Sequence, residues 1–306
     1  MSTAFIVLVL SLLLGLQPVT TDLYLPALPA LTQDLGATVA QAQLTLSGLL
    51  LAFGLSQLVW GPISDRFGRR PVLLLGLATY VVGAVGSALA GSMEALLLWR
   101  IVQGAALGAS VMCARALVRD LYSPELGARA ISKGLTGLGV IACLSIPLGG
   151  VLAEFFGWRI ALSAPALFGA ATLALIALRF EETLQRPDPD ALRPGTLVRT
   201  WLAILRNPTF LAFALLAAAT YGGLFTLLAA SSFVFIRLME LSRIEYAALM
   251  FVIVLAYVGG TLLCRRLLVR FGVQRTVAIG GVFSLVGGSL LGLGGLAGLE
   301  GVWPIL

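Results

Sequence analysis

The sequence contains no histidine and little charge of any kind. Only 11% of its 306 residues are charged, whereas 59% are hydrophobic. A soluble domain carries about a quarter charged residues, so this chain has too little polar surface to cover itself in water. The lack of histidine excludes histidine-based acid–base catalysis and histidine metal sites. We therefore expect an all-α integral membrane protein that is not an enzyme and binds no metal.

Cysteine and lysine are equally scarce. Cys113, Cys143 and Cys264 each stand alone in an apolar stretch, without the spacing of a metal or redox pair. We therefore expect no cofactor. Lys133 is the only lysine, so the net charge of +6 comes from arginine. Nucleic acid is not the expected partner, because arginine beside long apolar runs indicates positive charge at a membrane surface.

Long apolar runs dominate what is present. A helix needs about 20 mostly apolar residues to cross a bilayer, and the chain offers nine such runs. The first lacks the basic start and the cleavage site of a signal peptide, so we interpret it as a span. The predicted spans lie near residues 4–24, 43–63, 72–91, 93–117, 132–153, 158–178, 208–235, 244–264 and 276–297.

The positive residues fix the predicted orientation. If the N-terminus is cytoplasmic, 15 of the 20 basic residues fall in inner loops and three in outer loops. Basic residues concentrate in cytoplasmic loops, so we predict a cytoplasmic N-terminus. The polar segment 179–207 has the composition of a linker. It divides a six-helix bundle, residues 1–178, from a further bundle, residues 208–306.

A short motif repeats within the chain. Arg-Phe-Gly occurs at residues 66–68 and again at 270–272, each time after an even-numbered predicted span. Two related halves are common in secondary transporters. The repeat therefore predicts a transporter with about nine of twelve helices present and a partial second bundle of about three helices. A complete nine-span protein is the alternative.

Ionisable residues inside spans are candidates for function. Asp22 ends the first span, just before Pro26 and Pro29. Loss of hydration favours a neutral carboxyl group, so Asp22 is our candidate for proton coupling; a helix cap at the membrane interface is the alternative. Arg100 lies inside the fourth span with Gln103 one turn later, and we expect Arg100 to tune the coupling unless it reaches to the outer interface.

The loop after the second span has the most ordered pattern of charge. Residues 61–71 read Gly-Pro-Ile-Ser-Asp-Arg-Phe-Gly-Arg-Arg-Pro. We expect Asp65 to meet a helix N-terminus or an arginine, and the arginines to stay in cytoplasmic water. Arg119 and Asp120, at the inner end of the fourth span, are expected to pair with this loop. A merely basic inner loop is the alternative. The residues that carry this pattern are Gly61, Asp65, Arg66, Gly68, Arg69, Arg70, Arg119 and Asp120.

The fifth predicted span is rich in small residues. Gly139, Pro147, Gly149 and Gly150 permit close approach of a neighbouring backbone and a bend. Close packing without a functional role is the alternative.

Together these motifs resemble those of the major facilitator superfamily. Residues 61–71 resemble its signature loop, Arg100 with Gln103 its helix-four motif, and residues 139–150 its antiporter motif, although Ile146 stands where that motif usually has glycine. Residues 21–29 and 114–120 are similar to the bicyclomycin/chloramphenicol-resistance (Bcr/CflA) drug-efflux branch.

The resemblance implies a major-facilitator-type helical bundle in the bacterial inner membrane that exports small amphipathic compounds in exchange for protons. It implies that substrate binds between two bundles, and we expect Tyr24, Gln103 and Tyr221 to line that cavity. It also implies that the signature loop, with Arg119 and Asp120, gates the change of conformation. The expected partners are small-molecule substrates, protons and the lipid bilayer, and the expected state is a monomer driven by the proton gradient alone. Nutrient uptake and an inactive chain remain the alternative functions.

Overall fold

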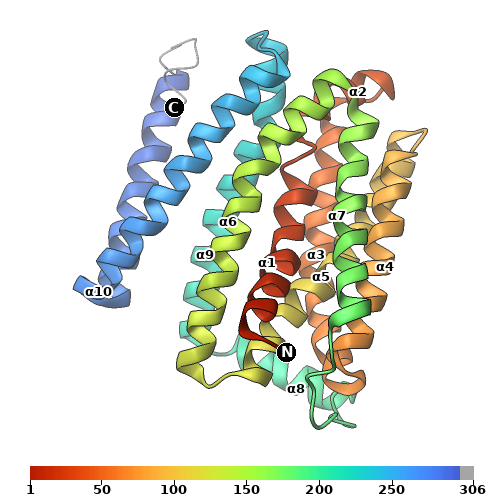
Figure 1. Ribbon diagram of the computed structural model, residues 1–306. Helices are drawn as coiled ribbons and strands as arrows, with labels where there is room; N and C mark the ends of the chain where they lie inside the picture. The colour runs from red at the N-terminus through yellow and green to blue at the C-terminus, as the bar shows by residue number, and fades with distance from the viewer. Residues whose placement is uncertain (297–306) are drawn as a thin grey trace.

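The computed structural model describes residues 1–296, apart from some side chains in the sixth and last long helices. Every regular element in this part of the chain is a helix (Figure 1). The first span is broken into α1 (Thr3–Thr21), the 3₁₀ turn η1 (Leu25–Ala27) and α2 (Leu28–Asp34). The other helices of the first bundle are α3 (Val39–Phe67), α4 (Arg69–Ala88), α5 (Met93–Leu121), α6 (Pro124–Phe155) and α7 (Trp158–Arg179).

The remaining elements are α8 (Pro194–Leu205), α9 (Pro208–Ser232), the π-helical turn η2 (Phe233–Leu238) and α10 (Arg243–Leu296). Eight helices within the described residues are long and apolar enough to cross a membrane. The predicted all-α membrane fold is therefore confirmed. The ninth predicted span falls in the last part of α10, and its final residue lies outside the described residues.

Local sequence explains where several helices begin and end. Thr38 and Gln41 form a capping box at the start of α3, each side chain accepting a backbone N–H of the other residue. Gly68 separates α3 from α4 with φ = 101°, a conformation that favours glycine. Gly272 (φ = 73°) likewise separates two helical segments within α10, where the chain turns back on itself (Figure 1).

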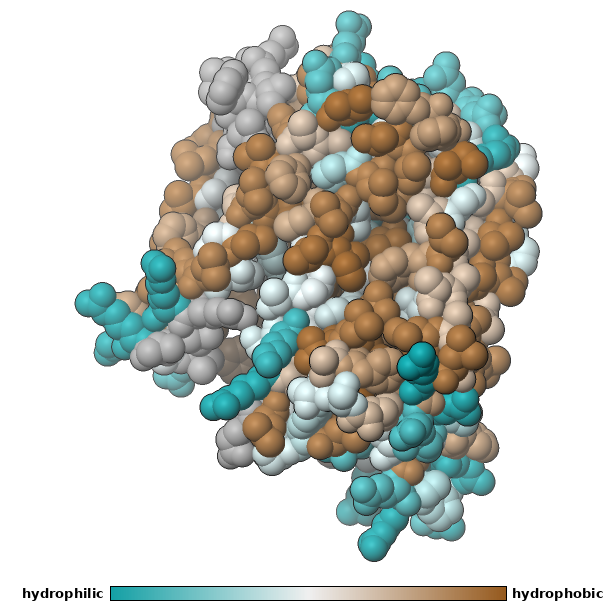
Figure 2. Space-filling model, viewed as in Figure 1, coloured by the Kyte–Doolittle hydropathy of each residue, from teal (hydrophilic) through white to brown (hydrophobic). Residues whose placement is uncertain are grey.

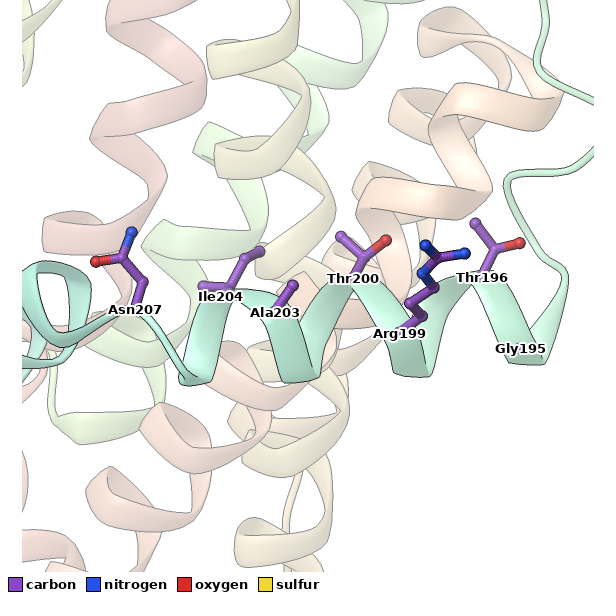
Figure 3. A pocket seen from close by; sticks show the side chains of 7 residues that line it. All are labelled: Gly195, Thr196, Arg199, Thr200, Ala203, Ile204 and Asn207. Atoms are coloured by element: carbon purple, nitrogen blue, oxygen red, sulfur yellow. The ribbon is translucent and has the colours of Figure 1, made fainter.

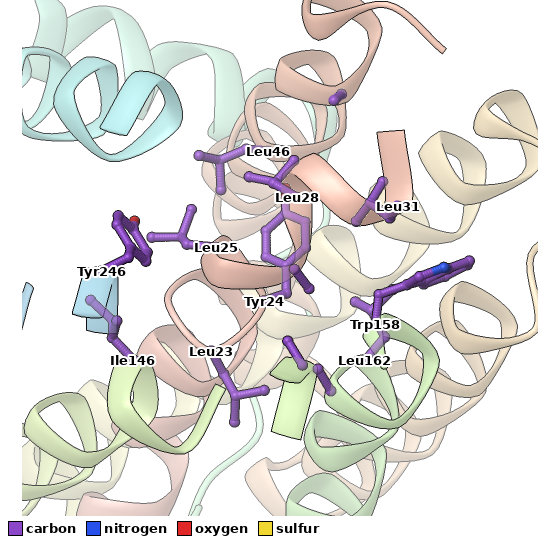
Figure 4. Close-up of a cluster of buried hydrophobic side chains, with 14 of the residues drawn as sticks. Leu23, Tyr24, Leu25, Leu28, Leu31, Leu46, Ile146, Trp158, Leu162 and Tyr246 are labelled. Atoms are coloured by element: carbon purple, nitrogen blue, oxygen red, sulfur yellow. The ribbon is translucent and has the colours of Figure 1, made fainter. Parts of the chain in front are cut away.

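The helices pack around two apolar cores. One core joins α1, α4 and α5 along the bundle and includes Leu13, Leu77 and Leu107. The other surrounds the break in the first span and draws in α6, α7 and α10 (Figure 4). In this second core Leu23 and Leu25 lie near Ile146 of α6 and Tyr246 of α10, so the broken span joins the two parts of the chain.

The two ends of the bundle differ. We call the end that carries the α3–α4 loop, the N-terminus and α8 the basic end, and the end that carries η1 and α2 the opposite end (Figure 1). Apolar residues cover most of the visible face between these ends, and hydrophilic residues gather at the ends (Figure 2). This distribution is that of a protein surrounded by lipid.

The segment 179–207 is more than an extended linker. Composition alone indicated a connection without structure of its own, but residues 194–205 form the helix α8. Pro194 occupies the first helical position, where its missing N–H costs nothing. A regular helix thus lies between α7 and α9.

Candidate functional site

Asp22 lies where the first span breaks. It caps the C-terminus of α1, and its backbone N–H donates to the Pro18 carbonyl at 2.8 Å. Its carboxylate accepts a hydrogen bond of 2.6 Å from the Thr21 hydroxyl and is partly buried. Among the described residues, no cation lies within ion-pair distance of Asp22. The structure thus places a carboxyl group without a counter-ion in an interrupted span.

Arg100 is fully buried in the middle of the bundle, so it does not reach the interface. Its guanidinium donates to Gln103 Oε1 and to the Thr20 carbonyl, each at 3.0 Å. It also lies over the ring of Tyr24, 4.0 Å from the ring centre, a cation–π contact. Its Nε has no hydrogen-bond partner among the described residues. Within the described part of the chain, Arg100 therefore sits in a polar cluster without a carboxylate.

Two tyrosines extend this cluster. The Tyr24 hydroxyl is 2.9 Å from Thr45 Oγ1, and the Tyr80 hydroxyl is 2.6 Å from Thr20 Oγ1. Tyr24 was predicted to line a substrate cavity, whereas Tyr80 and the two threonines were not among the predicted site residues. In this structure Tyr24 and Gln103 are buried beside Arg100. The structure brings Arg100, Gln103 and Tyr24 together through α1, α3, α4 and α5.

Tyr221 lies apart from the polar cluster. It is on α9, 57% exposed, and its ring stacks on that of Phe225 at 6.2 Å between centres. No interaction in the described part of the chain joins it to Tyr24 or Gln103. The three predicted cavity residues therefore do not meet in this conformation.

The predicted gating loop is held by a buried ion network at the basic end. Arg69 is 2% exposed and contacts Asp65 at 2.7 Å and Asp120 at 2.9 Å. It also donates to Ser64 Oγ at 2.7 Å. The prediction that Asp65 meets an arginine is confirmed, whereas the expectation that all the loop arginines stay in water is wrong for Arg69. Two carboxylates in different helices outweigh the loss of its hydration.

Arg119 and Asp120 pair with the loop as predicted, Asp120 closely and Arg119 at 3.8 Å from Asp65. The flanking arginines reach the end of α7 and the segment that follows it. Arg66 donates to the Pro189 carbonyl, and Arg70 donates to the Ala177 carbonyl at 3.0 Å. Gly61 lies on the inner face of α3, where an added Cβ would contact Met112.

Glu182 is the residue of this network that sequence reasoning missed. Its carboxylate accepts the backbone N–H groups of Arg69 and Arg70 at 2.9 and 3.0 Å, and those of Thr183 and Leu184 at 2.9 Å. Burial raises the pKa of Glu182, but these four hydrogen bonds outweigh that effect and bring the pKa below its ordinary value of 4.5. Glu182 therefore caps the N-terminus of α4.

A signal for this cap was present in the sequence. Gly68, the residue before α4, has no side chain with which to cap the helix, so the capping group had to come from elsewhere. Gly68 is needed for a second reason, because an added Cβ would lie 2.4 Å from Glu182 Oε2. The loop and the segment after α7 thus form one unit.

The small residues of α6 contact two different elements. An added Cβ at Gly149 would lie 1.8 Å from the Leu23 carbonyl, just after Asp22, and one at Gly150 would lie 2.6 Å from Ala247 of α10. Gly139 faces open space, and Pro147 lies within the helix. The pair Gly149 and Gly150 therefore brings α6 against both the broken span and α10.

Helical spans with a broken first helix, a buried arginine and a clamped basic loop define a multi-pass membrane transporter. The family model of the Major Facilitator Superfamily matches residues 10–306. The chain is 29% identical to a bicyclomycin resistance protein homolog of Haemophilus influenzae, over 99% of this chain and 76% of the relative. It is 30% identical to a chloramphenicol resistance protein of Pseudomonas aeruginosa, over 98% of this chain and 71% of the relative.

The fold has a solved counterpart. The xylose transporter XylE from E. coli, in a partially occluded inward-open conformation, superimposes with a TM-score of 0.79 at 16% identity, over 100% of this chain and 82% of that one. The chain belongs to the major facilitator superfamily, and its similarity to the bicyclomycin and chloramphenicol resistance proteins confirms the resemblance seen in the sequence. The superfamily comprises transporters, so the expectation that the chain is not an enzyme is also confirmed.

Proposed function

We propose that the chain exports small amphipathic compounds across the bacterial inner membrane in exchange for protons. The names of its relatives support drug export, since they are resistance proteins for bicyclomycin and chloramphenicol. The predominance of basic residues at the α8 end supports a cytoplasmic N-terminus. No cofactor would be needed, and a monomer would suffice.

The observation that carries the proposal is the environment of Asp22. A carboxyl group without a counter-ion, at a break in a span, can accept and release a proton when access to it changes sides. Gly149 of α6 packs against Leu23, the residue after Asp22, so a movement of α6 reaches this site directly. Protonation of Asp22 and binding of the compound would compete, and a proton entering from outside would release the compound outward.

Arg100 would tune this exchange from inside the bundle. Its Nε is free to donate a further hydrogen bond, so the buried cluster can respond when α1 and α5 shift. The exposed aromatic pair Tyr221 and Phe225 offers an apolar surface for the compound. Tyr24 and Gln103 would join that surface only after the break in the first span rearranges.

The test is transport in everted membrane vesicles with an imposed pH gradient, with chloramphenicol and bicyclomycin as probes. We expect Asp22→Asn to abolish proton-driven accumulation, because asparagine cannot release a proton. Asp34→Asn is the matched control: it is the same substitution in the same span, but at an exposed residue paired with Arg159 at 2.9 Å. The control should retain accumulation.

Undiminished exchange in Asp22→Asn would refute the proposal. Cells separate efflux from uptake, because an uncoupler should raise the internal concentration of an exported compound and lower that of an imported one. Absence of transport by the parent chain itself would support the inactive alternative.

A further inference from the structure

The helix α8 has two chemically distinct faces. At 100° per residue, its large apolar side chains fall within one arc, and its hydroxyl, amide and arginine side chains fall within the other. The apolar face consists of Leu197, Val198, Trp201, Leu202, Ile204 and Leu205. A helix with this division needs an apolar surface to cover one side and water on the other.

The described protein covers the apolar face only in part, since Leu197 and Trp201 are partly buried. No residue of α8 is buried, and Val198, Leu202 and Leu205 are 50%, 47% and 54% exposed. The polar face borders a hollow, and its side chains there point to one side of the helix (Figure 3). Ile204, at the border of the apolar arc, lines the same hollow with Thr196, Arg199, Thr200 and Asn207. Water can therefore reach the polar face, while four of the six large apolar side chains on the other face remain exposed.

The charge of this segment identifies what covers the apolar face. Arg193, Arg199 and Arg206 lie in or beside α8, and no acidic residue occurs between Asp190 and Glu240. Arg193 pairs with Asp190 at 2.9 Å, which leaves Arg199 and Arg206 without an ion pair among the described residues. Both lie at one border of the apolar arc, where they can reach phosphate groups while the apolar face enters the acyl region.

The position of α8 fits the same partner. The helix runs across the direction of the neighbouring helices at the basic end (Figure 3), so its axis lies along the membrane surface. It packs against the start of α9, whose own apolar surface is exposed. The apolar face of α8 is thus continuous with the apolar band of the spans. Trp201 is of the type that concentrates at this depth of a bilayer.

We propose that α8 is an interfacial helix that binds the anionic lipid surface of the membrane, with Arg199 and Arg206 contacting lipid phosphates. Binding to lipid fixes α8, which forms the last part of the segment 179–207. The gating loop holds an earlier part of the same segment. There the Asp188 N–H donates to the Asp65 carbonyl at 3.0 Å, and Arg66 binds the Pro189 carbonyl. Anionic lipid at α8 therefore acts on the position of the α3–α4 loop.

The test measures the depth of α8 in the full chain. Cys113, Cys143 and Cys264 are replaced by alanine, and single spin labels are attached at Val198→Cys and Leu202→Cys on the apolar face or at Thr196→Cys and Ala203→Cys on the polar face. Collision with oxygen, which concentrates in the bilayer, is compared with collision with a water-soluble nickel chelate. The vesicles contain phosphatidylcholine with or without phosphatidylglycerol. We expect oxygen to dominate on the apolar face and nickel on the polar face, most strongly with phosphatidylglycerol.

The arginines are tested in the same experiment. Each basic residue near an anionic surface contributes about fivefold to binding, so Arg199→Gln/Arg206→Gln should lower the ratio of inserted to uninserted helix about 25-fold. Arg186→Gln/Arg237→Gln removes the same charge from exposed positions outside α8 and should leave the ratio unchanged. Equal collision on both faces, equal depth in the two lipids, or an unchanged ratio in the first double variant would each overturn the proposal. None of these results depends on transport.

Discussion

Two buried arginines of one bundle have opposite surroundings. Arg69, at the basic end, contacts two carboxylates and a hydroxyl group. Arg100, in the middle of the bundle, contacts an amide, a backbone carbonyl and an aromatic ring. Both are almost fully enclosed, at 2% and 0% exposure, so burial does not distinguish them. The difference lies in whether an opposite charge compensates the loss of water.

This difference separates a structural arginine from a candidate for function. A compensated arginine holds its partners in one arrangement, and its removal leaves carboxylates without a partner. An uncompensated charge inside a span costs free energy and is retained where function requires it. The comparison therefore assigns the stability of the loop to Arg69 and a role in transport to Arg100.

The largest effect on stability is expected at Arg69. Arg69→Ala removes the common partner of Asp65 and Asp120, the second of which is only 14% exposed. We expect the free energy of unfolding in mixed detergent and SDS micelles to fall by about 3–5 kcal/mol. Arg66→Ala is the control, because Arg66 is exposed and has no ion pair among the described residues; its side chain donates to the Pro189 carbonyl and lies over the Phe67 ring. Equal losses in the two variants would remove the distinction between a compensated arginine and a surface one.

Much of the fold could be predicted from the sequence. Composition, apolar runs and the repeated Arg-Phe-Gly motif are properties of the chain alone, and they predicted a helical membrane transporter. The pairing of Arg119 and Asp120 with the loop was also predictable. The second and fourth predicted spans end on the same side of the membrane, so the loop after the second lies on the same side as the end of the fourth. Gly68 and Gly272 marked two turns.

What could not be predicted depends on contacts between distant residues. Burial of Arg69 follows from the convergence of α3, α4 and α5, which a loop sequence does not reveal. Glu182 is more than 110 residues from the helix it caps, and it lay in a segment that composition marked only as polar. Tyr24 and Tyr221 were grouped because both are aromatic, and only packing shows that they lie apart.

A smaller effect, dependent on pH, is expected at Glu182. Its folded-state pKa lies below 4.5, so the charged cap stabilises the folded state above that pH, and the contribution disappears as the pH falls through the folded-state pKa. Glu182→Gln should therefore be less stable than the parent at neutral pH, and the difference should shrink under acid conditions. The measurement is thermal unfolding in detergent across this range, with Glu181→Gln as the control. A difference that does not change with pH would contradict a charged cap.

A still smaller effect on stability is expected at Arg100, which sharpens the contrast with Arg69. Arg100→Met replaces an uncompensated charge with an apolar side chain of similar length, and we expect the free energy of unfolding to change by no more than about 1 kcal/mol. Transport in the same preparation should be lost. Arg100→Lys keeps the charge, but lysine lacks the planar guanidinium that donates to both Gln103 and the Thr20 carbonyl. This variant should therefore transport weakly. Destabilisation as large as that of Arg69→Ala would assign Arg100 a structural role.

The smallest effect is expected at Arg119, the exposed member of the basic-end network. Its guanidinium is 3.8 Å from Asp65, and its side chain is 69% exposed, so water and salt screen the pair. Arg119→Ala should lower the free energy of unfolding by about 0.2–1 kcal/mol, and the loss should vanish at high salt. A double-mutant cycle with Arg69→Ala, measured by the same unfolding assay, tests whether Asp65 depends on one arginine or on two. Near-additive effects are expected, because Asp65 is 2.7 Å from Arg69 but 3.8 Å from Arg119, whereas strong coupling would make Arg119 part of the compensated site.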